Sequence, residues 1–104
     1  MRARTDFQVR ASAGSALVPC RGVELSTTGV VIDRGRGTTE RDHRLLVQLE
    51  LSLAERTRPI RAVARSVWTR GPLQAFRFVR IADADRLNLA EHLDLVALRG
   101  GALA

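Results

Sequence analysis

The feature that most constrains the fold is the run RLLVQLELSL between positions 44 and 53, which alternates strictly from Val47 onward. Apolar residues occupy every second position from Leu45 to Leu53, and Gln48, Glu50 and Ser52 lie between them. Successive side chains of a strand point to opposite faces, so an extended chain would gather these apolar residues on one face. A helix would scatter them around its axis. The run therefore predicts a strand with one buried and one solvated face.

Five other segments have the same character, with alternating or β-branched residues between turn signals. Pro19 interrupts one of them, which favours a sheet edge or a bulge at that point. In the last segment, Phe76 and Phe78 are predicted to face inward together. The six predicted strands are Thr5–Ser12, Ala16–Leu25, Thr28–Asp33, Arg44–Leu53, Pro59–Thr69 and Leu73–Ile81.

A helix is predicted over about residues 83–98. Asp83 is a suitable N-cap, and Arg99 followed by two glycines is typical of a helix end. The apolar residues that share one face of this helix are Leu89, Leu93, Val96 and Ala97.

Together these elements predict a mainly β fold. It is a small six-stranded antiparallel β-barrel over about residues 5–81, with a C-terminal α-helix over about 83–98. The helix should pack across an open end of the barrel or cover a strand edge. The length of 104 residues suits a single domain, 1–104.

The net charge of +6 rests on arginine, because all 17 basic residues are of that type. Codon bias in a GC-rich genome would explain this, and so would selection for forked guanidinium donors that bind phosphate or guanine. The N-terminus does not resemble a signal peptide, no apolar run could span a membrane, and there is one cysteine. We therefore expect a cytoplasmic protein that does not enter a membrane.

The sequence shows no signature of catalysis. His43 and His92 lack the spacing of a metal site and are both predicted to be solvated. Cys20 is predicted to be a small buried hydrophobe and not a nucleophile. Asp83 and Asp85 suit the start of a helix. We expect a protein that is not an enzyme, with no catalytic residue, no metal site and no cofactor.

Charge is distributed unevenly along the chain. Residues 56–80 contain seven arginines and no acid, whereas residues 81–99 contain four acids and two arginines. The basic hairpin is either a solvated barrel exterior or a patch for an anionic partner, such as a nucleotide, a nucleic acid or an acidic protein. Trp68 beside it could stack on a base or close the core.

The segment VELSTTGVVI, residues 23–32, must turn the chain between two strands. Ser26 can hydrogen-bond the neighbouring backbone, and Gly29 can adopt positive φ or let another group approach closely. Nothing beyond a turn is required. Glu24 and Ser26 could equally present acceptors to the N1–H and N2–H₂ donors of a guanine edge, while arginine pairs with guanine O6/N7 or phosphate.

The order of elements resembles the PilZ domain family, the bacterial receptor module for cyclic di-GMP. That family has a six-stranded barrel followed by a helix, an Arg-x-x-x-Arg segment near its start and an Asp/Asn-x-Ser-x-x-Gly motif at the end of the second strand. Ser26 and Gly29 match the second motif, with Glu24 where Asp or Asn is usual. The stretch AVARSVWTRGPLQAFRFVRI, residues 62–81, is similar to the fifth and sixth strands, with Ala75 where glycine is common.

The arginine motif of the family is incomplete in this chain. Arg2 falls where the second arginine is expected, the first would precede Met1, and Arg4 stands at the wrong interval. The literal match from Arg61 to Arg65 lies too late in the chain and is attributed to chance. In the family this segment wraps the ligand. Losing half of it removes charge-assisted hydrogen bonds of about 1.5–3 kcal/mol each, or about ten- to a hundredfold in affinity apiece.

The resemblance implies a PilZ-like regulatory domain that binds cyclic di-GMP weakly. Arg2 and Arg4 would contact phosphate and guanine, Glu24 and Ser26 would accept from a guanine edge, and Gly29 would permit close approach. An alternative is a degenerate adaptor that binds a protein partner and no nucleotide. A third hypothesis, ranked below these two, is a nucleic-acid-binding barrel that uses the basic hairpin.

Overall fold

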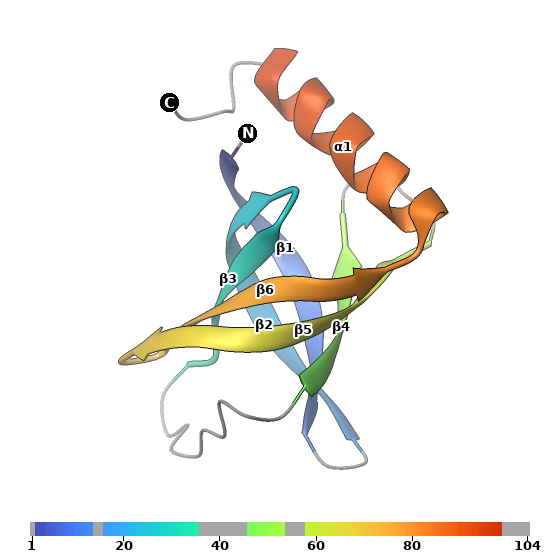
Figure 1. The fold of residues 1–104 in the computed structure, drawn as a ribbon. Coiled ribbons are helices and arrows are strands. Elements are labelled where there is room, and N and C mark those ends of the chain that lie inside the picture. Colours follow the sequence, from blue (N-terminus) through green and yellow to red (C-terminus); the bar gives the residue numbers. More distant parts are fainter. Residues whose placement is uncertain (1, 14–15, 36–45, 54–57, 99–104) are drawn as a thin grey trace.

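The computed structural model describes residues 2–13, 16–35, 46–53 and 58–98, with the side chains at 2–6, 13, 16 and 17 outside that description. Six strands and a helix lie in these ranges (Figure 1). They are β1 (Arg2–Ala13), β2 (Ala16–Ser26), β3 (Gly29–Asp33), β4 (Leu46–Ser52), β5 (Ile60–Arg70), β6 (Leu73–Ile81) and α1 (Asp83–Leu98).

The strands form a closed antiparallel barrel in the order β1-β2-β3-β6-β5-β4, which confirms the predicted architecture. The ring closes where β1, already paired with β2, also pairs with β4. Closing a sheet on itself removes its edges, so the helix has no edge to cover. Instead α1 contacts β1 and β5 and lies across one end of the barrel (Figure 1). This is the first of the two predicted positions.

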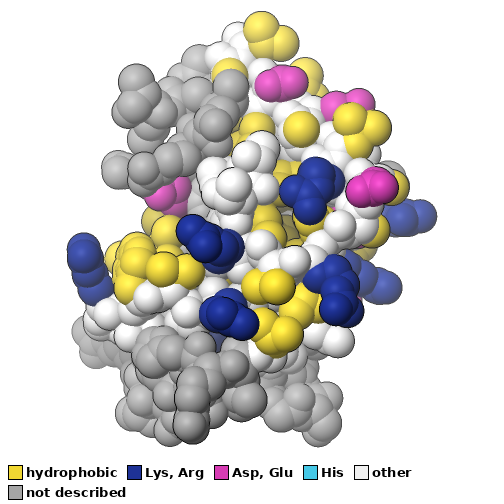
Figure 2. All heavy atoms as spheres, in the orientation of Figure 1, with side chains coloured by type: hydrophobic (Ala, Val, Ile, Leu, Met, Phe, Trp, Pro, Cys, Tyr) yellow, Lys and Arg dark blue, Asp and Glu magenta, His cyan; other side chains and the backbone are white. Residues whose placement is uncertain are grey.

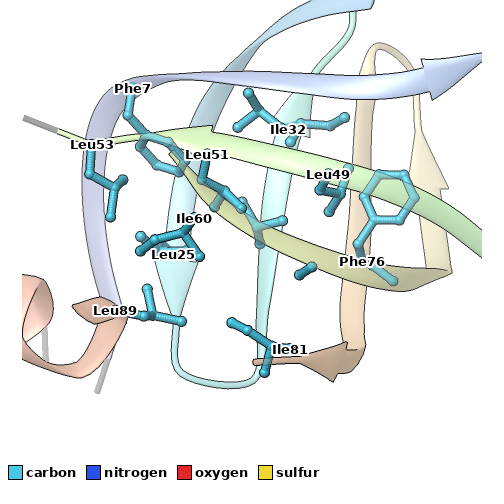
Figure 3. Close-up of a cluster of buried hydrophobic side chains, with 14 of the residues drawn as sticks. Phe7, Leu25, Ile32, Leu49, Leu51, Leu53, Ile60, Phe76, Ile81 and Leu89 are labelled. Carbon is cyan, nitrogen blue, oxygen red and sulfur yellow. The ribbon is translucent and has the colours of Figure 1, made fainter. Parts of the chain in front are cut away.

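One hydrophobic core fills the barrel and extends to the helix (Figure 3). The alternation that predicted β4 holds, because Leu49, Leu51 and the following Leu53 are buried while the residues between them are not. From α1, Leu89 and Leu93 join the same cluster. Burial of each leucine stabilises the fold by about 1.5–3 kcal/mol, so helix and barrel hold each other in place.

The pairing of β5 with β6 is interrupted by two bulges. The extra residues are Val79 of β6, opposite the step from Val63 to Ala64, and Val67 of β5. A bulge sets two residues against one, bends the strand and redirects side chains. Both bulged valines are exposed, on the same side of their strands as Arg65 and Arg77.

Strand β1 begins earlier than predicted, at Arg2 and not at Thr5, so the barrel spans 2–81. The reason is an irregularity between Arg4 and Phe7, beyond which β1 continues to pair with the end of β2. Pro19 lies where β2 extends beyond β3 and pairs with β1 alone, so this short stretch has the local edge that was predicted, although the ring of strands is closed.

One prediction about side-chain burial was wrong. His92 is 8% exposed and therefore buried, whereas His43 lies outside the described residues. His92 follows Leu89 by three positions, so it shares the inward face of the helix. Phe76 is buried and Phe78 is half-buried but packs against the core, so both face inward as predicted.

Candidate functional site

The candidate site is built on the turn from Ser26 to Gly29, which joins β2 to β3. The Ser26 Oγ accepts hydrogen bonds from the backbone N–H groups of Thr28 and Gly29, each at 3.2 Å. Its own hydrogen can go to the Thr28 hydroxyl at 3.2 Å or the Gly29 carbonyl at 3.4 Å. Serine is suited to this position because its short hydroxyl reaches backbone donors two and three residues ahead. Ser26 therefore shapes the turn.

Gly29 allows β3 and β6 to approach each other closely. A Cβ at this position would lie 2.2 Å from the carbonyl oxygen of Phe76, a backbone atom of β6. Gly29 pairs with Arg77, and beside it the Phe78 N–H donates to the Thr28 carbonyl at 2.8 Å. Of the two predicted roles for Gly29 the second is found, and the group that approaches is the protein's own backbone.

A depression of about 160 Å³, here called the turn hollow, opens beside this turn. Three of the five predicted site residues lie on its surface. Its lining consists of Glu24, Leu25, Ser26, Gly29, Val30, Val31, Ala75 and Phe76. The half-buried Glu24 supplies the acidic group of this lining, so the hollow combines a carboxylate with apolar walls.

The other two predicted site residues, Arg2 and Arg4, lie within β1 and not ahead of it. In the antiparallel register Arg2 is the partner of Ser26 and Arg4 is the partner of Glu24. Directly opposed residues have Cα atoms about 4.5–5.5 Å apart. The fold therefore brings the backbones of Arg2 and Arg4 next to the turn hollow.

The arginines of the β5–β6 hairpin point mainly to solvent. Arg61 and Arg65 are exposed on β5, and the Arg61 guanidinium lies 3.3 Å from a carboxylate oxygen of Glu50. Trp68 is half-buried, and the Arg70 guanidinium lies 5.0 Å from the centre of its ring. This cation–π contact occupies one surface of the indole.

A buried polar group at the start of β6, next to the turn hollow, was not predicted. Gln74 and Ser66 are both buried; the Gln74 amide donates to Ser66 Oγ at 2.9 Å and accepts from Arg34 Nε. The Arg34 guanidinium lies 5.8 Å from the ring centre of Phe76, which lines the turn hollow. A glutamine inside an apolar strand was the available signal, since buried amides need partners.

Nothing in the described ranges has the donor set of a metal centre, because no group of three His, Cys, Asp or Glu side chains comes together there. Cys20 is half-buried and packs against the core, where burial raises the pKa of its thiol and nearby Arg34 partly opposes that rise. No helix among the described residues has the length and apolar character to cross a bilayer.

Solved structures identify the fold. The chain is similar to the Bacillus subtilis inhibitor of motility MotI/DgrA, with a TM-score of 0.81 and 16% identity over 94% of this chain and 50% of that one. It is also similar to the PilZ domain of CeSA from a cellulose-synthesizing bacterium, with a TM-score of 0.69 and 13% identity over 93% and 98%. An uncharacterized Legionella protein follows, with a TM-score of 0.61 and 16% identity over 96% and 95%.

The chain thus spans half the length of the motility inhibitor and nearly all of the CeSA domain. No protein family description and no curated protein matched the sequence. At identities of 13–16% the likeness establishes the architecture. The chain has the fold of a PilZ domain.

Proposed function

We propose that this chain is a non-catalytic, PilZ-like regulatory domain of cyclic di-GMP signalling that binds the dinucleotide weakly. The observation that carries the proposal is the register of β1 on β2. It sets Arg2 opposite Ser26 and Arg4 opposite Glu24, at the hollow that Gly29 borders. Two separate segments of the sequence are therefore neighbours in the fold: the one with Arg2 and Arg4, and the one with Glu24, Ser26 and Gly29.

The chemistry of this group suits a guanine nucleotide. A carboxylate such as that of Glu24 accepts from the N1–H and N2–H₂ groups of guanine, and arginine binds phosphate or guanine O6/N7 through two parallel hydrogen bonds. A serine hydroxyl has two acceptor sites, and the Thr28 and Gly29 amides occupy both at Ser26. We therefore assign Ser26 to holding the turn, and the direct acceptor role to Glu24.

The size of the turn hollow supports weak binding. Its volume of about 160 Å³ is below the ~300–1,000 Å³ usual for ligand pockets. Ala75, where the family resemblance expects glycine, occupies part of its wall. Most of a cyclic dinucleotide would lie over the surface, where the arginines would supply much of the binding energy. With one arginine of the motif missing, we expect a dissociation constant in the micromolar range, or about −8 kcal/mol.

Calorimetric titration of the purified chain with cyclic di-GMP tests this function. We expect micromolar binding that Arg2→Ala and Arg4→Ala each weaken by about tenfold or more. Arg58→Ala, at an exposed arginine outside the hollow, is the matched control and should leave affinity unchanged. A folded chain that releases no heat up to high micromolar ligand overturns the proposal. Equal affinity for cyclic di-AMP would contradict the guanine contacts.

A second candidate function is an adaptor that binds a protein partner without nucleotide. The contacts of Ser26 and Gly29 favour this function. The turn hydrogen bonds account for Ser26, and the close approach of the Phe76 backbone accounts for Gly29, so neither residue requires a ligand. The same titration separates the two functions. Absence of heat from a folded chain supports the adaptor, and micromolar binding of cyclic di-GMP removes it.

A further inference from the structure

The outer surface of β5 and β6 concentrates positive charge that the described residues do not neutralise. Arg65 and Arg77 are direct cross-strand partners, and both are exposed. Neither forms an ion pair with any acid of the described residues. Like charges placed directly opposite each other destabilise a sheet. A partner that supplied acidic groups to this surface would relieve the repulsion.

The same surface exposes apolar side chains, two positions after each of these arginines. Val67 is 58% exposed and Val79 is 52% exposed, on either side of the two arginines. A groove of about 570 Å³ runs between them. We call this surface the β5–β6 face; its residues are Arg65, Ser66, Val67, Arg77, Phe78 and Val79. Its mixture of guanidinium and apolar groups suits a partner with carboxylate and apolar groups.

The outer side of α1 carries that complementary chemistry. Leu87, Leu95 and Leu98 are exposed there, with fractions of 60%, 38% and 83%, and Asp94 is exposed among them. At 3.6 residues per turn these four positions and Glu91 fall within a stripe about 100° wide, opposite the buried Leu89. We call it the outer stripe of α1. It is about 16 Å long, at 1.5 Å per residue, which matches about five residues of strand.

We propose that the partner of the β5–β6 face is a second copy of this chain, whose outer stripe of α1 lies in the groove. Figure 2 looks onto a face where arginines gather over β5 and β6 and acidic side chains lie over α1. Two such faces brought together about a two-fold axis set each helix on the other copy's sheet. Both contacts then form at once, and the assembly closes as a dimer instead of growing into a filament.

The apolar side chains favour a protein over a nucleic acid in this groove. Phosphate binding needs arginines and leaves the bulged Val67 and Val79 without a role. It also leaves the exposed leucines of α1 unexplained. A second copy uses both sets, burying leucine against valine while Asp94 faces the guanidinium groups.

Sedimentation velocity of the full chain over a range of concentrations tests the proposal. We expect a monomer–dimer equilibrium in the micromolar range that weakens at least severalfold between 50 and 500 mM NaCl, because salt screens the charge pairs. Arg65→Glu with Arg77→Glu should weaken the dimer more than tenfold. Leu87→Arg with Asp94→Arg should do the same. Arg58→Glu with Arg86→Glu changes the net charge as much as the first variant but lies outside both surfaces, and should not weaken the dimer.

Mixing the two interface variants gives the sharpest result. Two copies of the same variant repel each other, because the helix and the sheet that meet then carry charges of the same sign. In a pair made of one copy of each variant, both contacts join opposite charges. We expect a heterodimer of parental affinity from two monomeric proteins with native circular dichroism. A parent chain that stays monomeric at 500 μM overturns the proposal, and so does a mixture that stays monomeric. Salt-dependent binding of a single-stranded DNA 20-mer that Arg65→Glu with Arg77→Glu abolishes would assign the face to nucleic acid instead.

Discussion

Replacement of Gly29 by alanine tests whether this glycine serves the fold or a ligand. The new Cβ would lie 2.2 Å from the Phe76 carbonyl oxygen, whereas carbon–oxygen contacts between neighbouring strands are about 3.3–3.6 Å. The strands β3 and β6 must therefore separate by about 1 Å. That movement strains the adjacent hydrogen bond from the Phe78 N–H to the Thr28 carbonyl, 2.8 Å long. Overpacking of this kind costs about 1–3 kcal/mol.

Thermal and urea unfolding of the ligand-free chain, followed by circular dichroism, measure this cost. A loss of about 2 kcal/mol lowers the Tm of a domain of this size by about 8–16 °C. Ser52→Ala, at an exposed position of β4, is the control and should stay within about 0.5 kcal/mol of the parent. If Gly29→Ala left the Tm of the ligand-free chain unchanged, the close approach of β6 would not be the reason for glycine.

Three further changes probe other parts of the structure. Ser26→Ala removes the acceptor of two turn amides and should cost about 1 kcal/mol, seen as a lower Tm that Ser26→Thr restores; an unchanged Tm would refute the role of the hydroxyl. Gln74→Ala removes the partner of Arg34 and Ser66 and should lower stability by about 1–3 kcal/mol, measured as a lower urea midpoint, whereas an unchanged midpoint would show that the buried contacts contribute nothing. For Cys20, burial raises the thiol pKa, with an opposing effect from Arg34. Because the folded state favours the neutral thiol, its contribution to stability is present below the unfolded pKa and lost as pH rises through the folded one. Iodoacetamide should therefore modify Cys20 more slowly in the folded chain at pH 8 than in urea, as followed by mass spectrometry, and equal rates would contradict this.

Local patterns in the sequence were sufficient for the elements and the fold class. Alternation identified β4, and the acidic start and apolar spacing identified α1 over Asp83–Leu98, although Ala82 and not Asp83 accepts the first helical hydrogen bond. These signals depend on neighbours within one or two turns, so a single segment contains them. The position of His92, three residues after Leu89 on the inward face of the helix, was a signal that this side chain is buried. The prediction followed the general surface preference of histidine instead.

The sequence predicted which residues meet at the candidate site, but not what each of them does there. Glu24, Ser26 and Gly29 were singled out for ligand contact, and they do meet at one hollow. In the structure Ser26 is engaged by its own turn, and Gly29 by the backbone of β6. A strand whose Phe76 lies 47 positions after Gly29 supplies that second constraint, and no short motif encodes such a partner.

The sequence thus specified a barrel of about six strands closed by a helix, because side-chain alternation and helical spacing are properties of a continuous segment. Pairing between distant strands determined where the candidate site and the β5–β6 face lie. The register of β1 placed Arg2 and Arg4 beside the turn, and the bulged register of β5 on β6 set Arg65 opposite Arg77 between Val67 and Val79. Register and bulges arise where two distant strands match their faces and hydrogen bonds, so the functional surfaces of this protein follow from contacts that exist only after the barrel has closed.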